Sequence, residues 1–229
     1  MKELLSLLEG DGLEESAWPE AGDTIRKALE PGVWRNGGNA QDNAWIKPWG
    51  SDWNVLAQGY AVGALILANW VLKTHWFQDP LVYPVLFLFR HYLELRLKGL
   101  VELVRLLQRD ERPAPSSHSL KEVVSELDRS LPEVPGWDPV DPAWEAVKTC
   151  VMDLQQMDPK GEVFRYHRNT RGEAIHVKHP QSPEGQATVS YVNLRALSSL
   201  MQKVSNFLDA TRDWLEHDLE SRERQWLDV

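Results

Sequence analysis

Hydrophobic residues recur at helical spacing over most of the chain that follows residue 53. The stretch 54–74 is apolar, rich in small residues and free of turn signals, which predicts a largely buried helix. A second long helix is predicted over 83–109, because proline suits only the first turn of a helix and Pro84 would stand there. These two segments supply much of the expected core.

Three further helices are predicted downstream. Ser119 and Glu122 form a capping box at the start of the third helix, and Asp141 is the N-cap of a fourth helix over 142–157. The last helix is expected over 193–226. Its apolar stripe comprises Leu194, Leu197, Met201, Val204, Leu208, Thr211 and Leu215.

Between the fourth and the last helix the pattern changes to short alternating strings, VFRYH, AIHVK and ATVSY, separated by turn residues. We therefore expect an all-α fold: a four- to five-helix bundle with a small β-hairpin or extended loop inserted before the last helix. The bundle is expected to occupy residues 54–229. Residues 1–53 are expected to be a tryptophan-rich extension that packs on the bundle through Trp34, Trp45, Trp49 and Trp53.

Composition is that of a globular chain, with 42% hydrophobic and 26% charged residues over 229 positions. The longest nearly uninterrupted apolar run, 59–68, is about half of the roughly 20 residues that a membrane span needs, so no membrane contact is expected. Cys150 is the single cysteine, which rules out an internal disulfide. We expect a cytoplasmic protein.

The net charge of −9 repels nucleic acid on average, but the segment 160–180 has the opposite sign. Five basic against two acidic residues leave it with a charge of +3. Two interpretations stay open for this cationic segment: a solvated loop, or a surface that faces phosphate groups.

The second long helix carries charged residues on its apolar side. Arg90 and Glu94 fall among its core-facing leucines, where an unpaired charge costs several kcal/mol. A mutual pair in this order along a helix contributes only a few tenths of a kcal/mol, so we expect partners from elsewhere in the chain. One hypothesis is a structural ion pair of Glu94 with Arg165 that locks the cationic segment onto the bundle.

The functional hypothesis is an electropositive pocket that holds a phosphodiester and supplies proton transfer through a histidine. Its expected binding residues are Arg90, His91, Glu94, His118, Arg165, Tyr166 and Arg168, with His167 available for proton transfer.

Three sequence strings together resemble the HEPN-type helical proteins of prokaryotes. They are RHYLELRLK on the second long helix, HSLKEVVSEL on the third, and DPKGEVFRYH ahead of the last, and the resemblance covers 54–219. It implies an all-α bundle, a homodimer and, in many members, metal-independent RNA cleavage or nucleotide binding in toxin, defence and immunity systems. A separately encoded antitoxin or nucleotidyltransferase would be the partner protein.

The catalytic signature of that family is an arginine followed, after four to six residues, by a histidine. Arg171 and His176 have this spacing, with Gly172 where members usually carry a polar residue. The resemblance implies that Arg171 stabilises the phosphate charge and that His176 acts as acid or base, with His167 as a neighbouring candidate.

No phosphate-binding glycine motif, HExxH string or cysteine pair occurs, so we expect no cofactor and no metal site. Two functions remain open. The first is an RNA- or nucleotide-binding protein that cleaves RNA without metal. The second is a non-catalytic helical interaction module or partner subunit whose buried polar network is purely structural.

Overall fold

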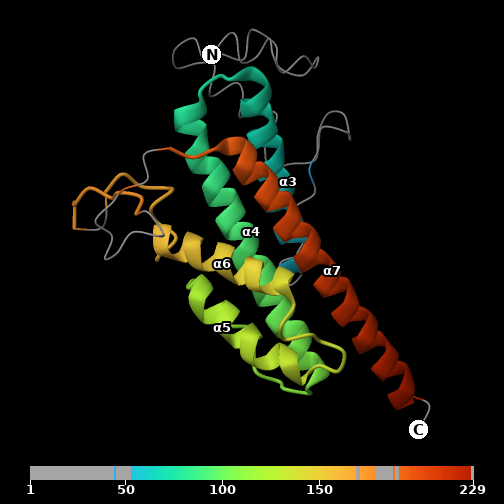
Figure 1. The fold of residues 1–229 in the computed structure, drawn as a ribbon. Helices are drawn as coiled ribbons and strands as arrows, with labels where there is room; N and C mark the ends of the chain where they lie inside the picture. Colours follow the sequence, from blue (N-terminus) through green and yellow to red (C-terminus); the bar gives the residue numbers. More distant parts are fainter. Residues whose placement is uncertain (1–43, 45–52, 169–170, 179–187, 189–190, 228–229) are drawn as a thin grey trace, which may run out of the picture. The chain divides into compact units, whose positions relative to one another are not determined.

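The computed structural model describes residues 44, 53–168, 171–178, 188 and 191–227 (Figure 1). Five helices pack together in this part of the chain, which confirms the all-α prediction. They are α3 (Trp53–Thr74), α4 (Gln78–Leu107), α5 (Leu120–Ser130), α6 (Pro142–Met157) and α7 (Leu194–Leu227), with a 3-10 turn at Leu131–Glu133 after α5. The expected tryptophan-rich extension over 1–53 lies outside the described residues, apart from positions 44 and 53.

Helix α4 is the centre of the bundle. It packs against α3, α5 and α7, while α7 also contacts α3, and α6 packs on α5 (Figure 1). Most of the predicted stripe of α7 faces this core, since Met201, Val204, Leu208 and Leu215 are all buried. Cys150 is buried on α6, and burial raises the pKa of its thiol to about 12.

The predicted helix starts are right at α5 and α6 and wrong at α4. The side chain of Ser119 accepts a hydrogen bond from the amide of Glu122, and Asp141 caps α6 through the amide of Ala143. Helix α4 begins at Gln78, five residues before the predicted start, with Pro84 inside it. The first four amides of a helix have no internal partner, so Pro80 is tolerated in the first turn, whereas Pro84 lies beyond that turn and removes one internal hydrogen bond.

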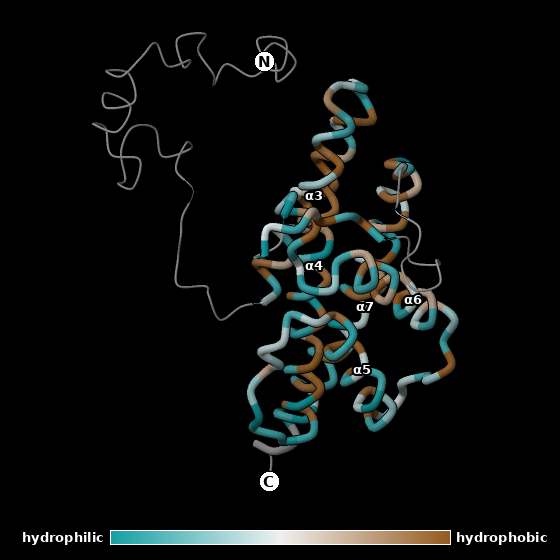
Figure 2. Tube along the Cα trace, turned by 90° about the vertical axis from the view of Figure 1, so that its left-hand side faces the viewer, coloured by the Kyte–Doolittle hydropathy of each residue, from teal (hydrophilic) through white to brown (hydrophobic). Residues whose placement is uncertain are grey.

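Within the described residues, α3 alone is long and apolar enough to cross a membrane, judged by length and composition only. The sequence prediction missed this because it counted the uninterrupted apolar run, whereas Gln58 and Asn69 are polar but uncharged and leave the mean hydropathy high (Figure 2). One side of α3 packs against the other helices, since Ala57, Ala64 and Ala68 are buried in the shared core. Core helices meet the same criterion.

The region between α6 and α7 contains no named strand in its described part. Two isolated antiparallel bridges join Arg168 with Ala174 and Lys178 with Thr188. The turn at the tip of the first bridge uses Gly172, whose φ of 80° lies in the left-handed region.

Candidate functional site

A row of charged residues runs along the buried side of α4. Arg90, Glu94 and Lys98 follow one another at intervals of four residues, so all three lie on one face of the helix. Arg90 and Glu94 are each only 3% exposed, as their position among the leucines predicted. Their charges therefore need partners within the protein.

Arg90 fastens two distant segments to α4. Its Nε donates to the backbone oxygen of Asp158 at 3.2 Å, and one Nη donates to the backbone oxygen of His118 at 3.0 Å. The carboxylate of Asp158 lies 3.4 Å from the same Nε, and that of Glu94 lies 3.4 Å from the other Nη. The loop before α5 and the turn after α6 thus share one buried guanidinium.

The turn after α6 is shaped around Arg90. Asp158 is fully buried, and one of its carboxylate oxygens accepts from the amides of Glu162 at 2.7 Å and Val163 at 3.0 Å. Gly161 adopts a φ of 72°, and a Cβ there would lie 3.0 Å from the Arg90 guanidinium. Only glycine fits this position without strain.

Glu94 holds an exposed histidine. One Glu94 oxygen accepts from Lys98 Nζ at 2.9 Å and lies 2.7 Å from Nδ1 of His118, whose side chain is 76% exposed. Burial by itself raises the pKa of Glu94, but the hydrogen bonds from Lys98 and His118 outweigh it and leave the pKa below its ordinary value. The carboxylate is therefore ionised at neutral pH and fixes the orientation of the imidazole ring.

Arg165 does not pair with Glu94, so the hypothesis of a structural ion pair between them is wrong. Its guanidinium carbon lies 5.4 Å from the ring centre of Phe87 and 5.2 Å from that of Tyr166. Phe87 stacks on His91 at 5.9 Å, and His91 meets the ring of Tyr60 edge-on at 4.3 Å. These five residues form an aromatic ladder that joins the cationic segment to α4 and α3.

His91 links the aromatic ladder to the charged row. Burial lowers its pKa below the ordinary value, the negative charge of Glu94 opposes this shift, and the positive charge of Arg90 adds to it. His91 is thus uncharged at neutral pH, and it contributes to the aromatic ladder by packing its imidazole ring between Phe87 and Tyr60.

The predicted catalytic residues lie on the segment between α6 and α7. His167, Arg171 and His176 are all exposed. The backbone oxygen of His167 accepts from the amide of Ile175 at 3.1 Å, and the side chain of Arg168 donates to the oxygen of Gly172 at 2.7 Å. The groups that hydrogen-bond to Glu94, in contrast, come from α4 and from His118.

Sequence reasoning missed the roles of Asp158, Gly161 and Lys98. The string DPKG was considered only as part of DPKGEVFRYH, with no role for its acid or its glycine. The available signal was an acid followed three residues later by glycine, directly after a predicted helix, at a point where a buried arginine still needed a partner.

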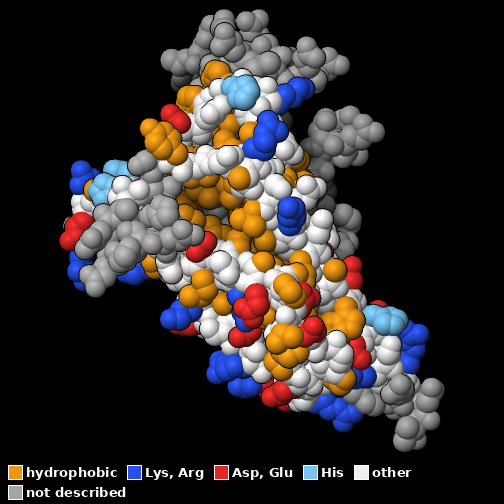
Figure 3. Space-filling model, viewed as in Figure 1, with side chains coloured by type: hydrophobic (Ala, Val, Ile, Leu, Met, Phe, Trp, Pro, Cys, Tyr) orange, Lys and Arg blue, Asp and Glu red, His pale blue; other side chains and the backbone are white. Residues whose placement is uncertain are grey.

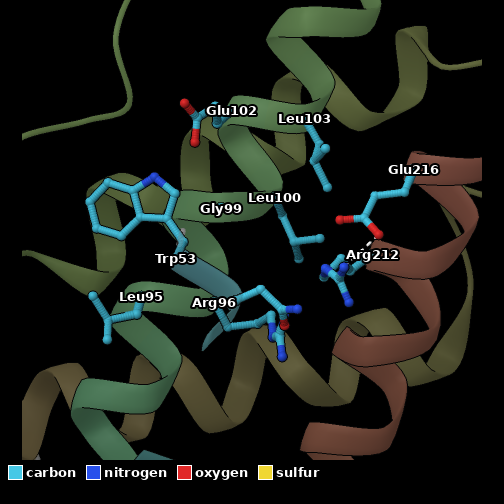
Figure 4. A pocket seen from close by; sticks show the side chains of 10 residues that line it. Trp53, Leu95, Arg96, Gly99, Leu100, Glu102, Leu103, Arg212 and Glu216 are labelled. Atoms are coloured by element: carbon cyan, nitrogen blue, oxygen red, sulfur yellow. Dashed lines mark hydrogen bonds and ion pairs between the residues drawn. The ribbon is translucent and has the colours of Figure 1, made fainter. Parts of the chain in front are cut away.

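Two of the cavities in the described part of the chain were considered as alternative phosphate sites. One of about 190 Å³ lies where α4 meets α7 and the start of α3 (Figure 4). Both arginines that line it already have partners. Arg96 bonds to Asn54 and Asp209, and Arg212 bonds to Glu216. The other, about 290 Å³, is a largely apolar hollow near the starts of α4 and α7 with no cation among its lining residues (Figure 3). Neither cavity favours a phosphate group.

The comparisons with known proteins add no identification. No protein-family model, curated protein or solved structure matches this chain. The function must therefore be inferred from the geometry around Glu94 and His118.

Proposed function

We propose that this chain binds RNA and cleaves its phosphodiester bonds by acid–base chemistry at His118. The observation that carries the proposal is an exposed imidazole whose Nδ1 lies 2.7 Å from the buried carboxylate of Glu94. A carboxylate on one ring nitrogen fixes the tautomer and leaves the other nitrogen free to accept a proton, which is the arrangement of a general base.

The proposed reaction uses the ribose as its nucleophile. Nε2 of His118 takes the proton of the 2′-hydroxyl, the 2′ oxygen attacks phosphorus, and the bond from phosphorus to the 5′ oxygen breaks. The leaving oxygen takes up a proton from water, and the resulting hydroxide accepts the proton held by Nε2, which restores neutral His118. The products are a 2′,3′-cyclic phosphate and a 5′-hydroxyl end.

The cationic segment supplies the binding surface for the RNA backbone. Lys160, Arg165 and Arg168 are exposed, and charge-assisted contacts to phosphate are the main source of affinity for RNA. This segment follows the turn at Asp158, and Arg90 donates to the backbone oxygens of both Asp158 and His118, which connects the start of the segment with the loop that carries the proposed base.

Under this proposal the chain is a HEPN-like protein with a β-hairpin before its last helix. It forms a homodimer and belongs to a cytoplasmic toxin or defence system. It moves the proton-transfer role from His176 to His118. Arg171 and His176 remain as exposed groups on the RNA-binding segment.

The test compares RNA cleavage by the wild type, His118→Ala, and the matched pair Arg171→Ala and His176→Ala, all with a chelator present. His118→Ala is expected to lower the rate about 10²- to 10⁴-fold, the usual contribution of a general base. The other two variants should cleave at rates closer to wild type. Loss of cleavage in His176→Ala alone would assign the chemistry to the family signature and refute the role of His118.

A second candidate function, the non-catalytic interaction module, is favoured by one observation. Arg90, Glu94 and Lys98 are buried and paired with one another or with backbone oxygens, which suffices to lock the bundle together. Under this alternative, none of the variants changes RNA integrity, and the wild type does not bind RNA at physiological salt.

A further inference from the structure

The aromatic ladder ends at an exposed ring that the acid–base chemistry does not use. Tyr166 is 54% exposed, and on its inner side the Arg165 guanidinium connects it to Phe87 on α4. An aromatic ring that projects from a cationic surface is the usual platform for an unpaired nucleobase, because every base has a π face and stacking needs no particular sequence.

Tyr166 is held on a fixed backbone. Its amide donates to the oxygen of Glu162 at 3.0 Å, and the neighbouring Arg165 donates from Nε to the oxygen of Gly161 at 2.7 Å. Phe164, two residues earlier, is buried in the core. Little further ordering is therefore required when a ligand stacks on the ring.

The same turn lies next to the proposed base. Gly161 packs against the Arg90 guanidinium, which also binds the backbone oxygen of His118. Further along the ladder, His91 directly follows Arg90 on α4, so the aromatic ladder and the charged row share one helix. Tyr166, through Arg165, and His118, through Arg90 and Glu94, are thus both held against α4.

We propose that Tyr166 is a base-stacking subsite, on which an unpaired nucleobase of RNA lies while the adjoining phosphate contacts Arg165. This inference rests on the proposed function and narrows it to single-stranded RNA. A base inside a duplex is already stacked on both faces and has none free for Tyr166.

The test measures binding of the full chain to a single-stranded RNA that carries 2-aminopurine, and to a duplex of the same sequence. Tyr166→Ala is expected to weaken single-strand binding about 5- to 100-fold, as the loss of one stacked base does. It should also remove the change in 2-aminopurine fluorescence. Tyr166→Phe keeps the ring and should bind within about twofold of wild type.

Tyr191→Ala is the matched control, because Tyr191 is 94% exposed and lies outside the aromatic ladder. It should bind as the wild type does. An unchanged affinity in Tyr166→Ala, with RNA binding by the wild type intact, overturns the subsite and leaves the proposed function standing. Absence of RNA binding by the wild type overturns both, and an equal loss on single strand and duplex overturns stacking in favour of a backbone contact.

Discussion

Glu94 is the counter-charge for Lys98, an ammonium that is 4% exposed on the next turn of α4. The same carboxylate bonds to Arg90 and orients His118, so one side chain serves both the packing and the proposed chemistry. Arg90 also forms an ion pair with Asp158. Within the described residues, Glu94 is the only ion-pair partner of Lys98.

Glu94→Gln is therefore expected to destabilise the fold by about 3–5 kcal/mol, because it leaves a buried cation without its counter-charge. The measurement is the free energy of unfolding in denaturant at neutral pH. Glu102→Gln, at an exposed position on the same helix, is the control and should change stability by less than about 0.5 kcal/mol.

The loss of stability caused by Glu94→Gln should be largest at neutral pH and should decrease as the pH falls. The folded-state pKa of Glu94 lies below its ordinary value of 4.5, so its stabilising contribution is complete above that value and is lost as the pH falls through the lowered folded-state pKa. The difference in melting temperature between wild type and variant should shrink below pH 4.5. A constant difference down to acid pH would contradict the assignment.

The burial of Arg90 and Glu94 could be predicted from the sequence because helical period alone places them among leucines. Their partners could not. Asp158 lies 68 residues from Arg90, and its contact depends on a left-handed glycine turn. His118 approaches Glu94 from a loop whose path no local pattern specifies.

At the scale of elements, helix starts follow their caps, and the geometry of each cap predicts what its loss costs. The Asp141 carboxylate accepts from Ala143 at 2.7 Å, whereas the Ser119 hydroxyl accepts from Glu122 at 3.4 Å. The first amide of α5 is also bonded at 2.8 Å by Gln155 of α6. Helix α5 thus has a second acceptor at its start.

Asp141→Ala should cost about 1 kcal/mol, a typical value for an N-cap, and Ser119→Ala less than about half of that. Thermal unfolding of the two variants in parallel measures the difference. The order would be contradicted if Ser119→Ala proved the more destabilising. Such caps can be predicted from the sequence. The start of α4 could not be predicted in this way, because its N-cap residue, Phe77, makes no side-chain capping hydrogen bond.

Helix α3 has an exposed apolar seam opposite its packed side. Val55, Gly59, Val62 and Ile66 follow one another at intervals of four, three and four residues, which is coiled-coil spacing. Ile66 is 65% exposed, and a Cβ on Gly59 would meet nothing within 4 Å. From Trp53 to Leu72 the helix carries no charge, so two copies of this acidic chain can meet there without repulsion.

We expect this seam to pair with the same seam of a second copy. Light scattering should detect a dimer of the wild type, and Ile66→Lys should raise its dissociation constant at least about tenfold, the effect of some 1.4 kcal/mol. Leu106→Lys replaces an exposed apolar residue on α4 and is the control. A wild type that is monomeric at high concentration would contradict the expectation.

A net charge of −9 repels RNA on average, so the proposed RNA binding requires a local excess of positive charge. Burial of Arg90 and Lys98 within the charged row removes those cations from the surface. The exposed Lys and Arg side chains of the cationic segment would then supply the attraction for RNA. They follow the turn at Asp158 that is hydrogen-bonded to Arg90 of α4. The sequence revealed the local charge reversal, but only the fold shows that the turn before it shares Arg90 with the His118 loop.

Lys160 and Lys178 are exposed at the two ends of the described cationic segment, which makes their contribution measurable. If each meets one phosphate of a single strand, Lys160→Gln/Lys178→Gln should reduce the slope of log affinity against log salt by about 1.4, since each contact contributes about 0.7. The double variant Lys73→Gln/Lys203→Gln changes net charge equally on exposed residues of α3 and α7 and should alter the slope much less. Equal slopes for both pairs would mean that RNA responds to net charge alone, and the cationic segment would lose its role.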